Sequence, residues 1–448
     1  MCINFLIERF SEEPDYIAII TDGNEFSYRD LSTSIEEAIR FTSSNIPQGE
    51  VVSLKADFTL QSISYFIALI FNNNIIVPIS NAVTSIQKFY KIAQVKYEID
   101  LLGNNNKVKI KYYNGLNSDS KHPLLKYLNN LNHPGLILFS SGSTGESKAA
   151  VHDLIPLMEK FQVRRPALRT LTFLLFDHIG GFNTLFHILS NNGTIITTTD
   201  RSPDNISKLI EKYKIELLPT SPTFINLMIL SRVYEKYDLS SLQLVTYGTE
   251  PMPEYVLKKF HDILPKVKLK QTYGLSELGI LRSKSKADNS LWVKIGGEGY
   301  ETKIVEDILY IKAKSAMLGY LNAPNPFDND GWFNTQDKVE VDGEWIKILG
   351  RVSDIINVGG QKVYPAEVES VLQSMDNVIN VSVYGQSNSI MGSVVAAKVC
   401  LNSNETALEF KKRMREFCKD KLETYKIPSI VEIVDEIKIS DRYKKVRG

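Results

Sequence analysis

Short apolar runs alternate with amphipathic segments along the first 290 residues. Residues 75–79, 136–139 and 194–197 are apolar enough to form buried strands, whereas residues 62–71 and 205–213 carry apolar positions at helical spacing. Strands that alternate with helices in this way predict parallel sheets covered by helices. Because ligands of such folds bind outside the carboxyl ends of the strands, we expect a site there.

The pattern changes after about residue 290, where short strands predict hairpins. Asp342 and Gly343 separate two of these strands and form a favourable hairpin turn. The last hundred residues predict the order strand, helix, strand, strand, helix. We therefore predict an α/β protein with a large N-terminal domain, residues 1–350, of helix-covered, mostly parallel sheets plus a β-rich subdomain. A small, mobile α+β C-terminal domain, residues 351–448, follows it.

Composition narrows the class of protein. The chain has 448 residues, 43% of them hydrophobic, and its 52 basic residues balance its 52 acidic residues. This balance gives no support for binding to nucleic acid or to an anionic membrane. The three cysteines suit a reducing compartment. The sequence carries no pattern typical of a secretory signal or a membrane span, so we expect a cytoplasmic protein.

One segment is too small and polar to pack in a core. Such residues can present backbone N–H groups, hydroxyls and a positive charge to an anion. Their spacing matches neither G-x-x-x-x-G-K-[ST] nor G-x-G-x-x-G, and by itself the segment fits a phosphate-binding loop and a surface turn equally well. The segment contains Ser140, Ser141, Gly142, Ser143, Thr144, Gly145 and Lys148.

Four further segments combine unusual side chains. Residues 273–277 place a hydroxyl beside a carboxylate, and residues 331–337 place Asp337 on a predicted turn. Residues 350–369 contain two adjacent glycines followed by a lysine, and residues 440–447 are strongly basic. Each alone has an ordinary structural explanation. In this order they resemble the adenylate-forming superfamily of acyl- and aryl-CoA synthetases, peptide-synthetase adenylation domains and luciferases, over nearly the whole chain.

The resemblance implies an enzyme that uses ATP and Mg²⁺ to convert a small carboxylic acid into an acyl-adenylate with release of pyrophosphate. The acyl group then passes to the thiol of CoA. The resemblance assigns catalytic roles to Lys444, Glu277, Lys148 and His178, with Lys445 as the alternative to Lys444. It assigns Mg²⁺ to Glu277 and Ser143. The residues it assigns to the nucleotide and to CoA are Ser140, Ser141, Gly142, Ser143, Thr144, Gly145, Lys148, Gly248, Thr249, Glu250, Tyr273, Gly274, Ser276, Asp337, Arg351, Gly360 and Lys362.

Two alternatives stay open. The first is a stand-alone adenylation enzyme that loads an amino or acyl group onto the phosphopantetheine of a carrier protein. The second is a nucleotide-binding relative without ligase activity, for which Tyr443 is the main argument. The family prefers glycine before the catalytic lysine, and a tyrosine would resist a positive φ and present Lys444 differently. Gln336 likewise stands where glycine usually precedes the ribose-binding acid.

The substrate segment, residues 176–182, matches two groups of relatives. Phe176 and Asp177 resemble amino-acid-activating domains, whose aspartate pairs with the α-ammonium group. Residues 178–181 resemble acyl- and aryl-CoA ligases, and this longer match favours an acid without an α-amino group. The predicted pocket is mostly aliphatic and aromatic, so we expect a modest apolar or aromatic acid.

Overall fold

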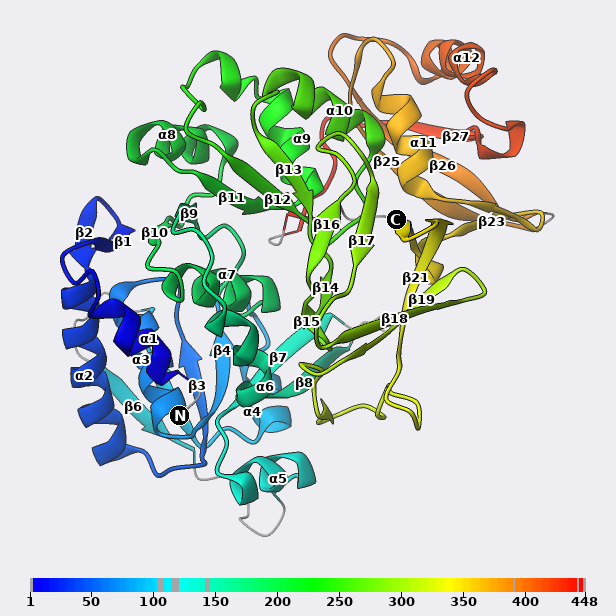
Figure 1. Ribbon diagram of the computed structural model, residues 1–448. Coiled ribbons are helices and arrows are strands. Elements are labelled where there is room, and N and C mark those ends of the chain that lie inside the picture. The colour runs from blue at the N-terminus through cyan, green and yellow to red at the C-terminus, as the bar shows by residue number, and fades with distance from the viewer. Residues whose placement is uncertain are drawn as a thin grey trace.

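The computed structural model describes residues 3–102, 108–113, 121–141, 146–389, 391–440 and 443–445, with the backbone alone at Ser141. Two large sheets and their helices form most of the chain, with a β-rich subdomain and a small C-terminal domain beside them (Figure 1). This arrangement confirms the fold class that the sequence predicted.

The first large sheet contains four parallel strands, β3, β4, β5 and β7. Strand β6 pairs antiparallel with β5, β8 with β7, and β20 with β8. The order of strands in this sheet is β20-β8-β7-β4-β3-β5-β6. All of β4 is buried, because apolar clusters that include helical residues cover both of its faces. The strands are β3 (Val51–Lys55), β4 (Ile75–Ile79), β5 (Tyr97–Asp100), β6 (Lys109–Tyr112), β7 (Gly135–Ser141), β8 (Ser147–Asp153) and β20 (Gly319–Tyr320).

The second large sheet is parallel except at β2 and has the order β13-β12-β11-β9-β10-β1-β2. Strands β10 and β11 are buried at every residue, as expected of a parallel sheet covered on both faces. The strands are β1 (Ile17–Thr21), β2 (Asn24–Ser27), β9 (Arg169–Leu171), β10 (Thr194–Thr197), β11 (Leu217–Thr220), β12 (Leu244–Tyr247) and β13 (Lys268–Gln271).

A continuous core containing α2, α3 and α7 joins the two large sheets. Helix α3 is apolar almost all round, as expected of a helix packed on several sides. Within the described ranges, no helix combines the length and apolarity needed to cross a bilayer. The helices are α1 (Asn4–Phe10), α2 (Tyr28–Asn45), α3 (Leu60–Phe71), α4 (Ile86–Ala93), α5 (Pro123–Leu131), α6 (Leu154–Met158), α7 (Ile179–Leu189), α8 (Pro203–Tyr213), α9 (Pro222–Leu230) and α10 (Glu254–Ile263), with the short 3₁₀ helices η2 (Glu159–Gln162) and η3 (Val233–Glu235).

The β-rich subdomain is an antiparallel sheet in the order β16-β17-β22-β21-β19-β18 with its own core. Asp337 lies within β21, so the turn predicted for it from the sequence is wrong. A short hairpin of β14 and β15 precedes the sheet. The strands are β14 (Gly274–Leu275), β15 (Gly279–Ile280), β16 (Ser283–Ser285), β17 (Trp292–Ile295), β18 (Tyr300–Val305), β19 (Ile308–Ala313), β21 (Phe333–Asp342) and β22 (Trp345–Arg351).

The small C-terminal domain has a separate apolar core that begins at Ile356. The 3₁₀ helix η4 connects it to β22. Residues 443–445 return to the N-terminal domain and pack against its second sheet. The remaining elements are η4 (Val352–Asp354), β23 (Ile356–Val358), β24 (Gln361–Val363), α11 (Pro365–Gln373), β25 (Val378–Asn388), β26 (Gly392–Leu401), α12 (Ala407–Cys418), η5 (Thr424–Lys426) and β27 (Ile430–Ile433).

Candidate active site

A cavity of about 360 Å³ lies where the carboxyl ends of β11, β12 and β13 meet the β-rich subdomain and the C-terminal segment. Both the N-terminal and the C-terminal parts of the chain contribute to its wall. Its position agrees with the site expected from the alternation of strands and helices. The predicted residues that line it are Ser140, His178, Gly248, Thr249, Glu250, Tyr273, Gly274, Ser276, Glu277, Asp337, Arg351 and Lys444.

The other predicted residues fall elsewhere. Lys148 lies beside the cavity, with its Nζ 5.4 Å from the centroid of the Tyr320 ring. Gly360 and Lys362 lie in the β23–β24 hairpin of the C-terminal domain and do not line the cavity. The side chain of Ser141 and all of Gly142, Ser143, Thr144 and Gly145 lie outside the described residues.

Tyr320 connects Glu277 with Lys148. Glu277 lies on the turn between β14 and β15, and the Tyr320 hydroxyl donates a hydrogen bond to its Oε1. Strand β20 pairs with β8, which places Tyr320 opposite Ala150 and close to Lys148. Burial and the Glu277 carboxylate raise the pKa of Tyr320, so the hydroxyl keeps its proton and orients the carboxylate. The sequence analysis assigned Tyr320 no role.

His152 supports the segment that carries Glu277. It lies fully buried in β8, and its Nε2 donates a hydrogen bond of 2.7 Å to the carbonyl oxygen of Ser276. Burial lowers the pKa of His152 to about 4, so the ring is neutral and its proton is on Nε2. The sequence signal was only a histidine in a predicted strand, which is more often structural than functional.

We expect acid to destabilise the protein through His152 between pH 6.5 and 4. Below the ordinary histidine pKa of 6.5, the unfolded chain binds a proton on His152 that the folded chain excludes. The free energy of unfolding therefore falls as the pH is lowered from 6.5 to 4. The loss is on the order of 2–3 kcal/mol, because one pKa unit corresponds to about 1.4 kcal/mol. Urea unfolding at a series of pH values measures it. His152→Gln keeps a donor for Ser276 and should flatten this slope, and an unchanged slope would contradict the assignment.

Asp337 faces the cavity from an irregular part of β21. The strand register shifts between Lys338 and Val339, and Gln336 adopts a positive φ of 62°. The Asp337 Oδ2 accepts a hydrogen bond of 2.5 Å from the Tyr273 hydroxyl, and its Oδ1 lies 3.6 Å from the Arg351 Nε. Burial raises the pKa of Asp337, whereas Tyr273 and Arg351 favour its charged form.

The two interpretations of the substrate segment depend on His178 and Asp177, and these two residues have different surroundings. His178 caps α7 by accepting a hydrogen bond of 3.0 Å from the backbone N–H of Gly180, and both residues line the cavity. A Cβ at Gly181 would lie 2.0 Å from the Leu175 carbonyl oxygen, so this close turn requires glycine.

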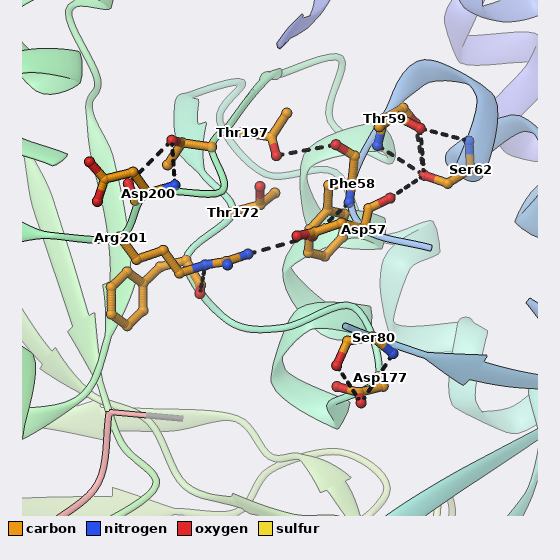
Figure 2. Close-up of polar contacts among 12 residues, drawn as sticks. Asp57, Phe58, Thr59, Ser62, Ser80, Thr172, Asp177, Thr197, Asp200 and Arg201 are labelled. Carbon is orange, nitrogen blue, oxygen red and sulfur yellow. Dashed lines mark hydrogen bonds and ion pairs between the residues drawn. The ribbon is translucent and has the colours of Figure 1, made fainter. Parts of the chain in front are cut away.

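Asp177 does not line the cavity. Figure 2 shows that its carboxylate contacts Ser80, whose hydroxyl donates a hydrogen bond of 2.8 Å to the Asp177 Oδ2. The aspartate is buried and held by the end of β4. This geometry supports the CoA-ligase-like interpretation of residues 178–181, because an α-ammonium group in the cavity would not meet Asp177.

Lys444 and Lys445 have different surroundings. Lys444 lines the cavity beside His178 and Thr249. Lys445 also borders the cavity, but its Nζ lies 3.3 Å from Glu369 Oε2 and donates a hydrogen bond of 2.9 Å to the Val381 carbonyl. The side chains of Lys445 and Glu369 are only 5% and 1% exposed. The C-terminal domain therefore holds the Lys445 ammonium, and the choice of Lys444 as the lysine that meets a ligand stays a prediction.

Tyr443 docks the C-terminal segment on the N-terminal domain. It adopts a φ of 51°, which tyrosine rarely takes, yet Lys444 still lines the cavity. Its ring packs 4.9 Å from Phe173 and 5.3 Å from Phe224, measured between centroids. Its hydroxyl donates a hydrogen bond of 2.8 Å to the carbonyl oxygen of Arg201, and Ser221 Oγ donates one of 2.7 Å to its carbonyl.

Arg201 is itself held firmly. Its Nε donates a hydrogen bond of 3.0 Å to the Phe173 carbonyl, and its guanidinium lies 3.5 Å from Asp57 Oδ1 (Figure 2). The residue whose carbonyl oxygen meets the Tyr443 hydroxyl is therefore anchored to the N-terminal domain by its side chain. The sequence analysis expected Tyr443 to resist a positive φ, and the structure shows that it adopts one while making these tertiary contacts.

Comparison with known proteins identifies the family. The sequence profile of AMP-binding enzymes matches residues 6–321, and that of the AMP-binding enzyme C-terminal domain matches residues 367–442. Acyl-CoA synthetase 7 of Caenorhabditis elegans is 25% identical over 96% of this chain and 92% of its own length. The 2-succinylbenzoate–CoA ligase of Bacillus pumilus is 25% identical over 97% of this chain and 94% of its own.

A solved structure shares the fold. The anthranilate CoA ligase AuaEII in complex with anthranoyl-AMP superimposes with a TM-score of 0.82 and 18% identity, covering 99% of this chain and 95% of that one. The likeness extends over both domains. Together with the two sequence profiles and the cavity between the domains, it gives the conclusion that this chain is an adenylate-forming ligase of the AMP-binding enzyme family.

Proposed function

We propose that this enzyme activates a carboxylic acid with ATP and then transfers the acyl group to the thiol of CoA. The observation that carries this proposal is the cavity itself, in which Glu277, Asp337 and Lys444 meet although they come from three separate parts of the chain. The reaction brings two anions together and expels a third, so cations and hydrogen-bond donors dominate its catalysis.

The nucleoside would lie between β12 and β21. Asp337 suits the ribose, because a carboxylate accepts hydrogen bonds from both hydroxyls, and Arg351 lies beside it. Gly248 permits the close approach of two chain segments, since a Cβ there would lie 2.7 Å from the Thr272 carbonyl oxygen. Tyr273 offers a ring for the adenine, and the positive φ of Thr249, 75°, turns the backbone at the cavity wall.

The triphosphate would lie along the segment from Ser140 to Lys148. Glu277 fits Mg²⁺, since that ion is usually held by one or two carboxylates together with phosphate oxygens. When bound, Mg²⁺ would neutralise charge on the phosphates. Lys148 would hold the leaving pyrophosphate, with Tyr320 keeping Glu277 in place. Ser143, the second residue assigned to the metal, lies outside the described residues.

The acid would enter beside His178, at the N-terminus of α7. Its carboxylate oxygen would form a bond to the α-phosphorus, and the bond between that phosphorus and the bridging oxygen to the β-phosphate would break, releasing pyrophosphate. Lys444 would lie between the carboxylate and the α-phosphate and offset the repulsion between them. His178, which lines the same cavity, would orient the acid.

For the second step the C-terminal domain would rotate about the segment of η4. The thiol would lose its proton and its sulfur would form a bond to the acyl carbon, while the bond from that carbon to the phosphate oxygen breaks and releases AMP. Lys444 must leave before this attack, and alternation of a domain about a short hinge is a known way to build two sites in turn. Ser353, exposed within η4, is the proposed hinge residue. Rotation would bring Gly360 and Lys362 toward the cavity, where they would meet the pantetheine arm and a phosphate of CoA.

Two assays test the proposal. ATP–pyrophosphate exchange over a panel of carboxylic acids tests adenylation, and we expect at least one acid to support it. Thioester formation with free CoA and with a pantetheinylated carrier protein then tests the acceptor. Formation with CoA would support the proposal, and formation with the carrier alone would overturn its second half. Absence of exchange with every acid would overturn it entirely.

Asp337→Asn is expected to raise the KM for ATP roughly tenfold with a smaller change in kcat. The substitution keeps the volume and an oxygen acceptor but removes the charge, which is worth about 1.5 kcal/mol in a charge-assisted hydrogen bond. Exchange assays at several ATP concentrations measure both constants. Asp354→Asn, which removes the charge of another carboxylate that lines the same cavity, is the control. A larger effect on kcat than on KM would argue against a role in binding the ribose.

A further inference from the structure

The two peptide groups that flank Lys444 are held by side chains of the N-terminal domain. The Tyr443 carbonyl oxygen accepts a hydrogen bond of 2.7 Å from the Ser221 hydroxyl. The Lys445 N–H donates a longer one, of 3.4 Å, to the Glu250 Oε2. The backbone on each side of Lys444 is therefore tied to the domain that forms most of the cavity wall.

Ser440 completes the hydrogen bonding of the same two peptide groups. Its N–H donates a hydrogen bond of 2.9 Å to the Lys444 carbonyl oxygen, and its hydroxyl accepts one of 3.3 Å from the Lys444 N–H. Both carbonyl oxygens and both N–H groups beside Lys444 thus have partners, two within the C-terminal segment and two in the N-terminal domain. Because the backbone conformation of a residue restricts the rotamers of its side chain, these bonds set the direction of Lys444.

The two contacts from the N-terminal domain share one support, the first turn of α9. Ser221 is the N-cap of this helix and is fully buried, and its Oγ accepts a hydrogen bond of 3.1 Å from the Phe224 N–H. The Glu250 Oε1 accepts one of 2.9 Å from the Thr223 N–H in the same turn. Each side chain therefore uses part of its hydrogen-bonding capacity on α9 and part on the C-terminal segment.

We propose that Ser221 and Glu250 are positioning residues for the adenylation step, which hold the backbone around Lys444 so that its ammonium group reaches the reacting carboxylate and the α-phosphate. This rests on the proposed function, in which Lys444 supplies that charge. Both contacts are made to backbone groups, so they do not depend on the side chains of Tyr443 and Lys445. They would break when the C-terminal domain rotates for the second step.

The sequence analysis assigned Ser221 no role and assigned Glu250 to the nucleotide. Ser221 lies 222 residues from Tyr443 in the chain, and Glu250 lies 195 residues from Lys445. No local pattern therefore indicated either contact. Glu250 does line the cavity, so the tests below separate a role in docking from a role in binding ATP.

Ser221→Ala should lower kcat for ATP–pyrophosphate exchange about tenfold, as expected when one hydrogen bond that fixes a catalytic group is lost. The KM for ATP and thioester formation from preformed acyl-adenylate should each change less than about twofold, because neither depends on the docked Lys444. Equal losses in both half-reactions would overturn the inference.

Ser202→Ala is the matched control for the loss of a helix cap. Ser202 is also an N-cap serine before a proline, at the start of α8, and its Oγ accepts a hydrogen bond from the Asn205 N–H. Among the described residues its side chain has no hydrogen bond to the C-terminal segment. Both half-reactions should therefore keep wild-type rates, and a loss of exchange equal to that of Ser221→Ala would overturn the inference.

A double-mutant cycle tests whether the effect of Ser221 passes through Lys444. In a Lys444→Ala background, Ser221→Ala should change exchange less than about twofold, because the group that it positions is gone. A further loss of about tenfold there would show a general effect on the fold and overturn this inference, leaving the proposed function standing. Exchange that is unchanged by Lys444→Ala alone would overturn both.

Glu250→Gln is the second variant, should Ser221→Ala fold poorly in thermal unfolding. It keeps the volume of the side chain but replaces one acceptor oxygen by an NH₂ group, so one of the two backbone N–H groups loses its partner. We expect kcat for exchange to fall about three- to tenfold with the KM for ATP unchanged. A raised KM with an unchanged kcat would assign the side chain to the nucleotide and overturn its positioning role.

Discussion

Lys444→Ala is expected to slow ATP–pyrophosphate exchange by about 10²–10³-fold, the loss typical when one group that stabilises developing charge is removed. Lys444, from the C-terminal segment, lines the cavity together with His178. Thioester formation from preformed acyl-adenylate should change less than threefold, because in the proposed second step this lysine has left the site. The two half-reactions, measured separately on the same preparation, give the comparison.

Two other lysines serve as controls for this prediction. Lys438→Ala removes an exposed lysine from the same segment and should leave both half-reactions unchanged. Lys445→Met removes the partner of the buried Glu369, so we expect a lower melting temperature of the C-terminal domain but retained exchange in the folded protein. Equal losses of both half-reactions in Lys444→Ala would contradict the alternation of two domain positions.

The order of motifs located most of the candidate site, because the chemistry fixes the residue types. Glu277, Asp337 and Lys444 are each the side chain that a metal, a ribose or a reacting carboxylate needs, and all three line one cavity. Partnerships within the fold were not predictable in this way. Lys445 and Glu369 are 76 residues apart, and neither carries a pattern that indicates the other.

The backbone shows a second limit of sequence patterns. Gln336 and Tyr443 stand where the family resemblance led us to expect glycine, yet they keep the positive φ that glycine would allow. Glu306 and Asp307 also adopt positive φ, as a two-residue hairpin turn between β18 and β19 requires. Each such residue costs about 1–2 kcal/mol, so tertiary contacts must offset it. Conformational propensity predicts from the sequence the energetic cost of a positive φ at these residues. The tertiary contacts that offset this cost are seen only in the folded structure.

Tyr443→Ala is expected to slow exchange by about 30–700-fold while leaving thioester formation from preformed adenylate near the wild-type rate. The substitution removes the contacts with Phe173 and Phe224 and the hydrogen bond to the Arg201 carbonyl. Aromatic pairs contribute about 0.5–1.5 kcal/mol each and a hydrogen bond about 1 kcal/mol, and 1.4 kcal/mol corresponds to tenfold. The docked position that presents Lys444 would therefore lose about 2–4 kcal/mol.

Tyr443→Gly separates docking from backbone strain. Glycine removes the cost of the positive φ, about 1–2 kcal/mol, but also removes the ring, so exchange should fall less than in Tyr443→Ala and still lie below wild type. Tyr443→Phe keeps the ring contacts and loses only the hydrogen bond to Arg201, so a change of about fivefold is expected. If Tyr443→Gly matched or exceeded the wild type in exchange, the tyrosine would be a tolerated substitution and not the anchor that holds Lys444 in the cavity.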